Sequence, residues 1–89
     1  MIVREVTLIN KLGMHARAAT KFVQLAQKFK SKVIVEKDGV EINGKSILGL
    51  MTLAAPVGSK LIIKVDGQDE KEAMEALVNL INDRFGEPE

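Results

Sequence analysis

The chain contains no cysteine, tryptophan or tyrosine, and only one histidine, two prolines and three phenylalanines among its 89 residues. Without cysteine it can form neither a disulfide nor a thiolate metal site. A single histidine also excludes a metal site built from several histidines of one chain. Hydrophobic residues make up 46%, which favours a globular chain with one modest core over a disordered one. The length predicts a single domain over residues 1-89, and we expect no metal and no cofactor.

No apolar run is long enough to span a membrane. The first five residues, Met1 to Glu5, lack the apolar core of a signal peptide. These two observations predict a cytoplasmic protein without membrane insertion. We also expect it to be a monomer.

Charge is distributed unevenly, although the net charge is only +1. The segment from Val6 to Val35 carries six basic residues and no acidic one, whereas the segment from Asp66 to Glu89 carries eight acidic and two basic residues. The first segment therefore predicts a positive surface, which suits a phosphate group or an acidic protein partner. Nucleic acid is the competing interpretation of a basic patch. The absence of tryptophan and tyrosine and a pI of 8.0 argue against it, so we expect no nucleic acid.

The only histidine, His15, stands where a strand pattern gives way to a helix pattern. Strand periodicity runs up to Ile9, and apolar spacing typical of a helix begins at Ala16. The unpartnered amides and the dipole at a helix N-terminus favour an anion and disfavour an imidazolium cation. We therefore expect a largely neutral His15 with one ring nitrogen free to attack, while Arg17 adds a forked positive charge. The pattern predicts a site that holds a phosphoryl group; a helix cap or an ordinary surface histidine is the alternative interpretation.

A second feature is Ser46, a favourable N-cap for a short helix predicted over 47–53. The apolar residues of this helix are too many for one face of so short an element. We expect Leu50 and Leu53 to be the more buried members. The more exposed members, which would form a docking patch, are expected to be Ile47, Leu48 and Met51.

The stretch from Gly39 to Ser46 also matches the letters of the nucleotide-binding P-loop. A P-loop follows a buried strand and wraps phosphate with free backbone amides. Here residues 40–42 alternate like a strand, whose amides should be used in pairing, and the helical stretch that follows is short. We therefore reject nucleotide binding.

Periodicity predicts the order strand–helix–strand–strand–helix–strand–helix. The predicted strands lie around residues 2–8, 33–35, 40–43 and 61–65. The first helix is expected over 16–29, and an Asp-Gly turn makes the second and third strands an antiparallel hairpin. Asp69 and Glu72 resemble a capping box for the last helix, whose buried stripe is expected to reach Phe85, and the tail 86–89 is expected to fray. One apolar face for each element predicts an α+β fold, a two-layer open-faced β-sandwich.

The segment Lys11 to Arg17, with the sequence KLGMHAR, resembles the active-site signature of the HPr family, the histidine-containing phosphocarriers of the bacterial phosphotransferase system. The segment Lys45 to Met51, KSILGLM, resembles the regulatory serine motif of that family. The spacing of the two motifs and the order of elements fit over nearly the whole chain. Ala18 is a departure, because the family usually has proline there. Alanine is an excellent helix former and restores one N–H, so we expect the helix and the activity to be kept.

The resemblance implies a fully antiparallel sheet in spatial order 1-4-2-3, covered on one face by three helices. It also implies that Enzyme I donates a phosphoryl group to Nδ1 of His15, which passes it to sugar-specific Enzyme IIA components or regulatory acceptors. The chain would then be a phosphocarrier rather than a free-standing enzyme. Arg17 and the backbone amides of Ala16, Arg17 and Ala18 would hold the phosphate.

Ser46 would be a site of regulatory phosphorylation, with an HPr kinase/phosphorylase and a transcriptional regulator as further partners. The residues expected at the docking surface are Thr20, Lys21, Ile47, Leu48 and Met51. Two alternatives stay open at this point. One is a regulatory carrier of the same fold without sugar transport, and the other is a non-catalytic interaction module in which His15 is structural.

Overall fold

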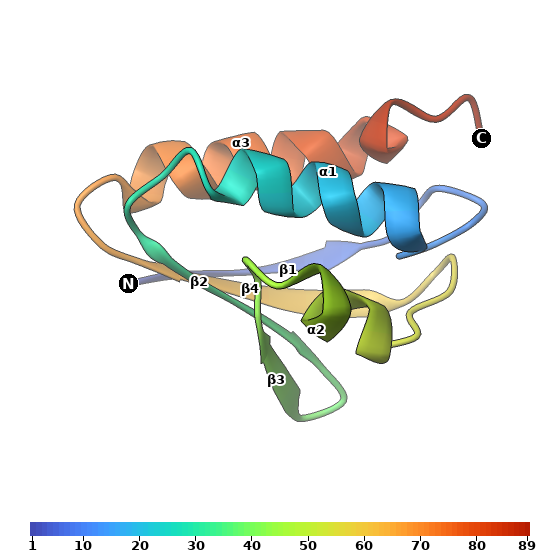
Figure 1. Ribbon diagram of the computed structural model, residues 1–89, viewed down its shortest axis with the longest axis horizontal. Coiled ribbons are helices and arrows are strands. Elements are labelled where there is room, and N and C mark those ends of the chain that lie inside the picture. Colours follow the sequence, from blue (N-terminus) through green and yellow to red (C-terminus); the bar gives the residue numbers. More distant parts are fainter.

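A computed structural model describes all 89 residues. Its elements are β1 (Ile2–Thr7), α1 (Ala16–Ala26), β2 (Lys32–Lys37), β3 (Val40–Asn43), α2 (Ile47–Thr52), β4 (Lys60–Asp66), α3 (Glu70–Asn82) and a final 3₁₀ turn, η1 (Arg84–Gly86). The strands form one sheet in the order β1-β4-β2-β3, and every neighbouring pair is antiparallel (Figure 1). The architecture expected from the sequence is therefore confirmed.

The central strand β4 shows why the sheet has one covered face. Its residues Leu61, Ile63 and Val65 are fully buried, whereas Ile62 and Lys64 between them are only half-buried. Because side chains alternate between the two faces of a strand, the helices must cover one face and leave the other open.

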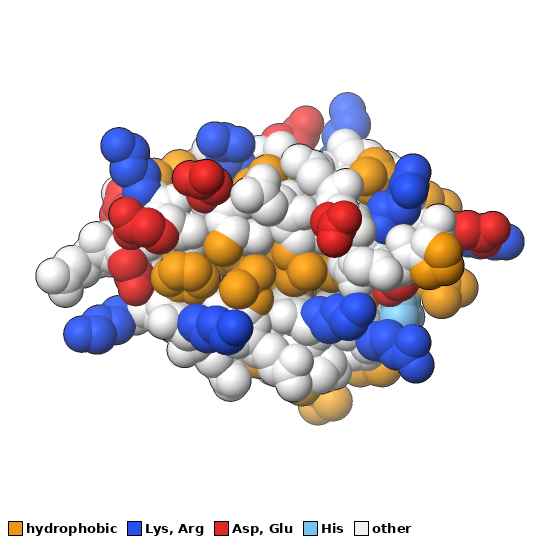
Figure 2. All heavy atoms as spheres, turned by 90° about the horizontal axis from the view of Figure 1, so that it is seen from above, with side chains coloured by type: hydrophobic (Ala, Val, Ile, Leu, Met, Phe, Trp, Pro, Cys, Tyr) orange, Lys and Arg blue, Asp and Glu red, His pale blue; other side chains and the backbone are white.

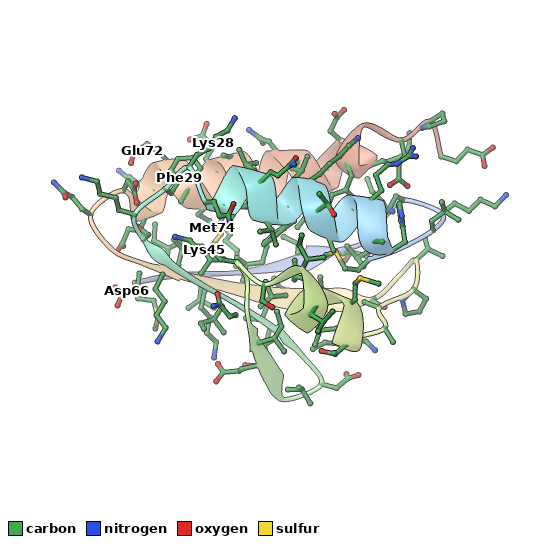
Figure 3. All side chains as sticks on the ribbon, viewed as in Figure 1. Lys28, Phe29, Lys45, Asp66, Glu72 and Met74 are labelled. Atoms are coloured by element: carbon green, nitrogen blue, oxygen red, sulfur yellow. The ribbon has the colours of Figure 1, made fainter.

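Helices α1 and α3 lie side by side over this face, and α2 packs against α1 and β3 (Figure 1). The buried stripe of α1 comprises Ala18, Ala19, Phe22, Val23 and Ala26. The stripe of α3 includes Met74, which is 2% exposed and points toward the sheet (Figure 3). None of these helices is both long and apolar enough to cross a bilayer.

Two details at the far ends of the helices differ from the sequence-based expectation. Helix α1 ends at Ala26, and residues 27–30 form turns rather than continuing the helix to Phe29. The predicted capping box is wrong, because the Asp69 carboxylate makes no capping bond to α3. It instead accepts hydrogen bonds from the backbone N–H groups of Lys30 (2.8 Å) and Ser31 (2.9 Å) and from the Ser31 hydroxyl (2.5 Å). The connection between α1 and β2 lies next to the start of α3, so its N–H and hydroxyl groups bind the Asp69 carboxylate that the local sequence had suggested as a helix cap.

The C-terminal segment differs more. Helix α3 ends at Asn82, and Arg84 and Phe85 both adopt left-handed backbone conformations, with φ of 55° and 54°. This turn brings Phe85 into the core, where it is fully buried although it lies beyond the helix. The tail, which was expected to fray, is placed against the body of the protein: the Lys11 N–H donates to the backbone oxygen of Glu89 at 3.0 Å. The tail therefore lies at the same end of the molecule as the start of α1 (Figure 1).

Candidate functional site

His15 occupies the N-cap position directly before α1, with an extended backbone (φ −79°, ψ 177°). The N–H of Arg17 donates to the ring nitrogen Nδ1 of His15 at 3.3 Å. The first backbone bond of the helix runs from the Ala19 N–H to the His15 carbonyl oxygen at 2.9 Å. The amides of Ala16, Arg17 and Ala18 therefore precede the helical hydrogen-bond ladder, as expected at a helix N-terminus.

The loop before His15 is held against the segment that follows α2. The Met14 N–H donates to the Ala55 carbonyl oxygen at 2.9 Å, and the Met14 side chain is buried. Gly13 has a φ of +66°, and a Cβ at this position would lie 2.3 Å from the same carbonyl oxygen. Only glycine combines this conformation with this approach, so Gly13 fixes where the chain enters α1.

The other ring nitrogen of His15, Nε2, lies 2.5 Å from Oε2 of Glu87 in the C-terminal tail. The second oxygen of Glu87, Oε1, accepts a hydrogen bond at 3.1 Å from Nδ2 of Asn10, a fully buried side chain. The same Nδ2 donates to the Gly13 carbonyl oxygen at 2.8 Å. The two flanks of the His15 ring thus face different groups: a backbone amide at Nδ1 and a carboxylate at Nε2.

Burial alone would raise the pKa of Glu87, since its side chain is only 11% exposed. Hydrogen bonds from His15 and Asn10, and the nearby positive charge, outweigh this effect and lower the pKa below its ordinary value. Glu87 is therefore ionised at neutral pH and acts as a hydrogen-bond acceptor only.

His15 opens onto a shallow groove of about 630 Å³. Its walls include Lys11, Leu12, Ala16, Arg17 and Glu87. The guanidinium of Arg17 is exposed and enters none of the ion pairs within the chain. Figure 2 shows the single histidine at one end of the helical face, among acidic and basic side chains. The groove wall therefore includes the His15 ring, the free guanidinium of Arg17 and the helix-start residue Ala16, an arrangement suited to an anion. Ala18, the third residue predicted to bind phosphate through its amide, is fully buried and does not line the groove.

The residues predicted for docking lie on two neighbouring elements. Thr20 bonds its hydroxyl to the Ala16 carbonyl oxygen at 2.8 Å. Lys21 donates from Nζ to the Phe85 carbonyl oxygen at 2.6 Å, so it also ties the C-terminal turn to α1. On α2 the predicted division is confirmed: Leu50 and Leu53 are buried. The exposed apolar side chains are Ile47 (39%), Leu48 (76%) and Met51 (42%).

Ser46 is the N-cap of α2, as predicted, and its hydroxyl oxygen accepts from the Gly49 N–H at 3.0 Å. The P-loop interpretation is excluded, because residues 40–43 form β3 and pair with β2. Lys45, the lysine of that letter pattern, extends toward the end of α1 and donates to the Phe29 carbonyl oxygen at 2.8 Å (Figure 3).

Sequence reasoning missed Asn10 and Glu87. Asn10 lies in the short linker between the first strand and the first helix, and Glu87 belongs to an acidic tail that was expected to fray. Only Phe85, an aromatic residue followed by glycine just beyond the helix, indicated that the chain returns to the core there. The structure contains no group of three histidine, cysteine, aspartate or glutamate side chains that could hold a metal ion.

An open-faced sandwich with this order of elements is the fold of a class of small phosphocarrier proteins, as comparison with a solved structure shows. The family described as the PTS HPr component phosphorylation site matches residues 2–83. The phosphocarrier protein HPr of Neisseria meningitidis serogroup A is 54% identical over 89 residues, which are 100% of both chains. The crystal structure of HPr-C-His from Thermoanaerobacter tengcongensis has a TM-score of 0.96 and 45% identity and covers 100% of both chains. The HPr-like protein Crh of Halalkalibacterium halodurans is 47% identical over 81 residues, covering 91% of this chain and 96% of the relative. The chain belongs to the HPr family of the phosphotransferase system.

Proposed function

We propose that the chain receives a phosphoryl group from a phosphohistidine of Enzyme I on Nδ1 of His15 and passes it to sugar-specific Enzyme IIA components. The observation that carries this proposal is the N-cap position of His15, with Nδ1 3.3 Å from the amide nitrogen of Arg17. This nitrogen has only the weak 3.3 Å bond from the Arg17 N–H, which must open for the attack, whereas Nε2 is held by the Glu87 carboxylate at 2.5 Å. The His15 ring lines the groove.

In the transfer step, the lone pair of Nδ1 attacks phosphorus while the phosphorus–nitrogen bond of the donor histidine breaks and its electron pair returns to that nitrogen. Such transfers depend on in-line positioning and on stabilising the charge of the equatorial oxygens, more than on acid–base groups. Of the three predicted amide donors at the helix N-terminus, those of Ala16 and Arg17 belong to residues of the groove wall. The Arg17 N–H would turn from Nδ1 to a phosphate oxygen during transfer, and the amide of the buried Ala18 would bind only if the first turn of the helix opened. The forked guanidinium of Arg17 supplies a planar, permanent charge.

Docking combines two surfaces that border the groove. Arg17 and Lys21 on α1 contribute positive charge, and Thr20 adds a polar contact. The exposed apolar side chains of α2 add apolar surface that is buried when the partner binds, which charge attraction alone does not provide. An acidic surface on Enzyme I is the partner that this combination suits.

Ser46 is the proposed site of regulatory phosphorylation, by an HPr kinase/phosphorylase and with a transcriptional regulator as a further partner. Its hydroxyl is half-buried at the start of α2, directly beside Ile47 of the docking patch. A phosphate adds about −1.5 to −2 charges at neutral pH. This charge would oppose the binding of an acidic partner without removing a core contact.

A second candidate keeps the carrier chemistry but serves regulation rather than sugar transport. The 47% identity to the HPr-like protein Crh favours it, and a related solved structure is described as the Bacillus subtilis catabolite repression HPr. The set of acceptor proteins that take the phosphoryl group separates the two candidates. In both of them we propose a monomer that works in the cytoplasm.

The test is to incubate the protein with Enzyme I and phosphoenolpyruvate labelled on phosphorus. We expect one acid-labile, base-stable label per chain, and none on a folded His15→Ala variant. A label of unchanged amount on His15→Ala would end the carrier proposal. If the wild-type chain accepts no label, the remaining interpretation is a non-catalytic interaction module in which His15 only caps α1.

A further inference from the structure

The C-terminal tail makes more specific contacts with the site than a passive chain end requires. The carboxylate of Glu87 bridges Nε2 of His15 (2.5 Å) and Nδ2 of Asn10 (3.1 Å). Asn10 is fully buried and is itself fixed by its bond to the Gly13 carbonyl oxygen. Lys21 holds the turn that precedes Glu87. The family match ends at residue 83, before this anchored tail begins.

We infer that Glu87 is a positioning residue for phosphoryl transfer: it holds the ring proton of His15 on Nε2 and so turns Nδ1 toward the groove as the nucleophile. The inference rests on the proposed function. A neutral imidazole carries one proton, and the nitrogen without it is the acceptor. An ionised carboxylate can only accept, so Nε2 must be the donor. The Arg17 N–H at Nδ1 requires the same tautomer from the other side of the ring.

Glu87 also has a role after the attack. When Nδ1 bonds to phosphorus, the proton stays on Nε2 and the ring gains positive charge. The carboxylate next to Nε2 stabilises this cation, as the buried carboxylate does beside the histidine of a serine protease triad. When the phosphoryl group leaves, the electron pair of the phosphorus–nitrogen bond returns to Nδ1, and the proton again remains on Nε2. The carboxylate therefore takes no proton in either direction.

A carboxylate beside a phosphate-binding groove could instead act as a brake, through charge repulsion. The geometry argues against this role, because Glu87 contacts the nitrogen that does not react. The two roles also predict opposite signs. If Glu87 repelled the phosphoryl group or an acidic partner, neutralising it would speed transfer; if it positions and stabilises the ring, neutralising it slows transfer.

The experiment compares Glu87→Gln with Glu89→Gln. Both variants remove one negative charge from the wall of the same groove. Only Glu87 is bonded to the His15 ring, because Glu89 instead pairs with Lys11 at 3.4 Å, and both of those side chains are more than 70% exposed. Proton NMR of the unphosphorylated proteins reports the hydrogen-bonded Nε2–H of His15 as a slowly exchanging low-field signal. Single-turnover transfer from phosphorylated Enzyme I gives the rate, and thermal melting checks the fold.

In the wild type and in Glu89→Gln we expect the low-field signal and transfer rates within twofold of each other. In Glu87→Gln the signal should move upfield and exchange faster, and transfer should slow about tenfold, because a charge-assisted hydrogen bond is roughly twice as strong as a neutral one. Transfer by a folded Glu87→Gln variant at or above the wild-type rate would overturn the role of Glu87 while leaving the proposed function intact. A wild-type chain that accepts no label at all would overturn both.

Discussion

The entry of the chain into α1 depends on Gly13, and replacing this glycine by alanine tests how the site is held. Two costs add at this position. The left-handed conformation, with φ of +66°, disfavours any residue with a Cβ by about 1–2 kcal/mol. The new Cβ would also lie 2.3 Å from the Ala55 carbonyl oxygen and 2.9 Å from Cα of Pro56. Both neighbours are backbone atoms, so the loop has to move.

Movement of the loop weakens the bond from the Met14 N–H to the same Ala55 carbonyl oxygen. Leaving a buried backbone group without its partner costs about 1–3 kcal/mol. The chain offers a matched control in Gly39, which has a φ of +82° but no atom within 4 Å of the position that a Cβ would occupy. Gly39→Ala carries only the conformational cost, so the difference between the two variants isolates the close approach.

We therefore expect Gly13→Ala to be less stable than Gly39→Ala by about 1–3 kcal/mol, which corresponds to a melting temperature roughly 5–20 °C lower for a domain of this size. Urea unfolding of both variants and the wild type, followed by circular dichroism, gives the free energies. Equal destabilisation of the two variants would refute the argument that the backbone contact at Gly13 fixes the loop before His15.

Three further predictions concern other groups. Arg17→Lys should slow transfer from Enzyme I clearly with little change in melting temperature, because lysine keeps the charge but loses the fork; transfer at the wild-type rate by Arg17→Ala would show that the amides suffice. Ser46→Asp should slow transfer yet stay folded, since aspartate is an equally good N-cap, whereas Ser46→Ala should lose about 1 kcal/mol of stability and transfer normally. Hydrogen bonds, chiefly from Ser31, hold the pKa of Asp69 at about 2, below its ordinary 3.8. The stabilisation that these bonds provide is complete above pH 3.8 and is lost as the pH falls through about 2. The free energy of unfolding of Asp69→Asn should therefore fall less steeply in acid than that of the wild type, and an equally steep fall would contradict this assignment.

Much of the fold could be predicted from the sequence, because period and turn chemistry are local signals. The alternation of Leu61, Ile63 and Val65 marks the buried face of β4, and the apolar spacing of α1 marks its core side. The order of the strands in the sheet was not encoded locally, and it came from the resemblance to a family. His15 could be found because it is the only histidine and stands at a helix start, where the physical chemistry of free amides is general.

The contacts that the sequence did not predict join residues far apart in the chain. By its spacing Asp69 resembles a helix cap. Its carboxylate instead accepts hydrogen bonds from two backbone N–H groups and a hydroxyl of the α1–β2 connection. Glu87 lies 72 positions from His15. It reaches the histidine because Arg84 and Phe85 adopt left-handed conformations that neither residue type favours. Burial of the Phe85 ring stabilises that turn, and the pair Phe85-Gly86 is its only local signal.

The central claim is that Nδ1 of His15 carries the phosphoryl group, and NMR of the phosphorylated protein tests it most directly. The protein would be labelled with nitrogen-15 in its histidine ring and phosphorylated by Enzyme I. One-bond coupling between phosphorus and a ring nitrogen then identifies the attached atom. We expect this coupling at Nδ1, with the proton on Nε2. Coupling at Nε2, or a phosphate on any residue other than His15, would contradict the account.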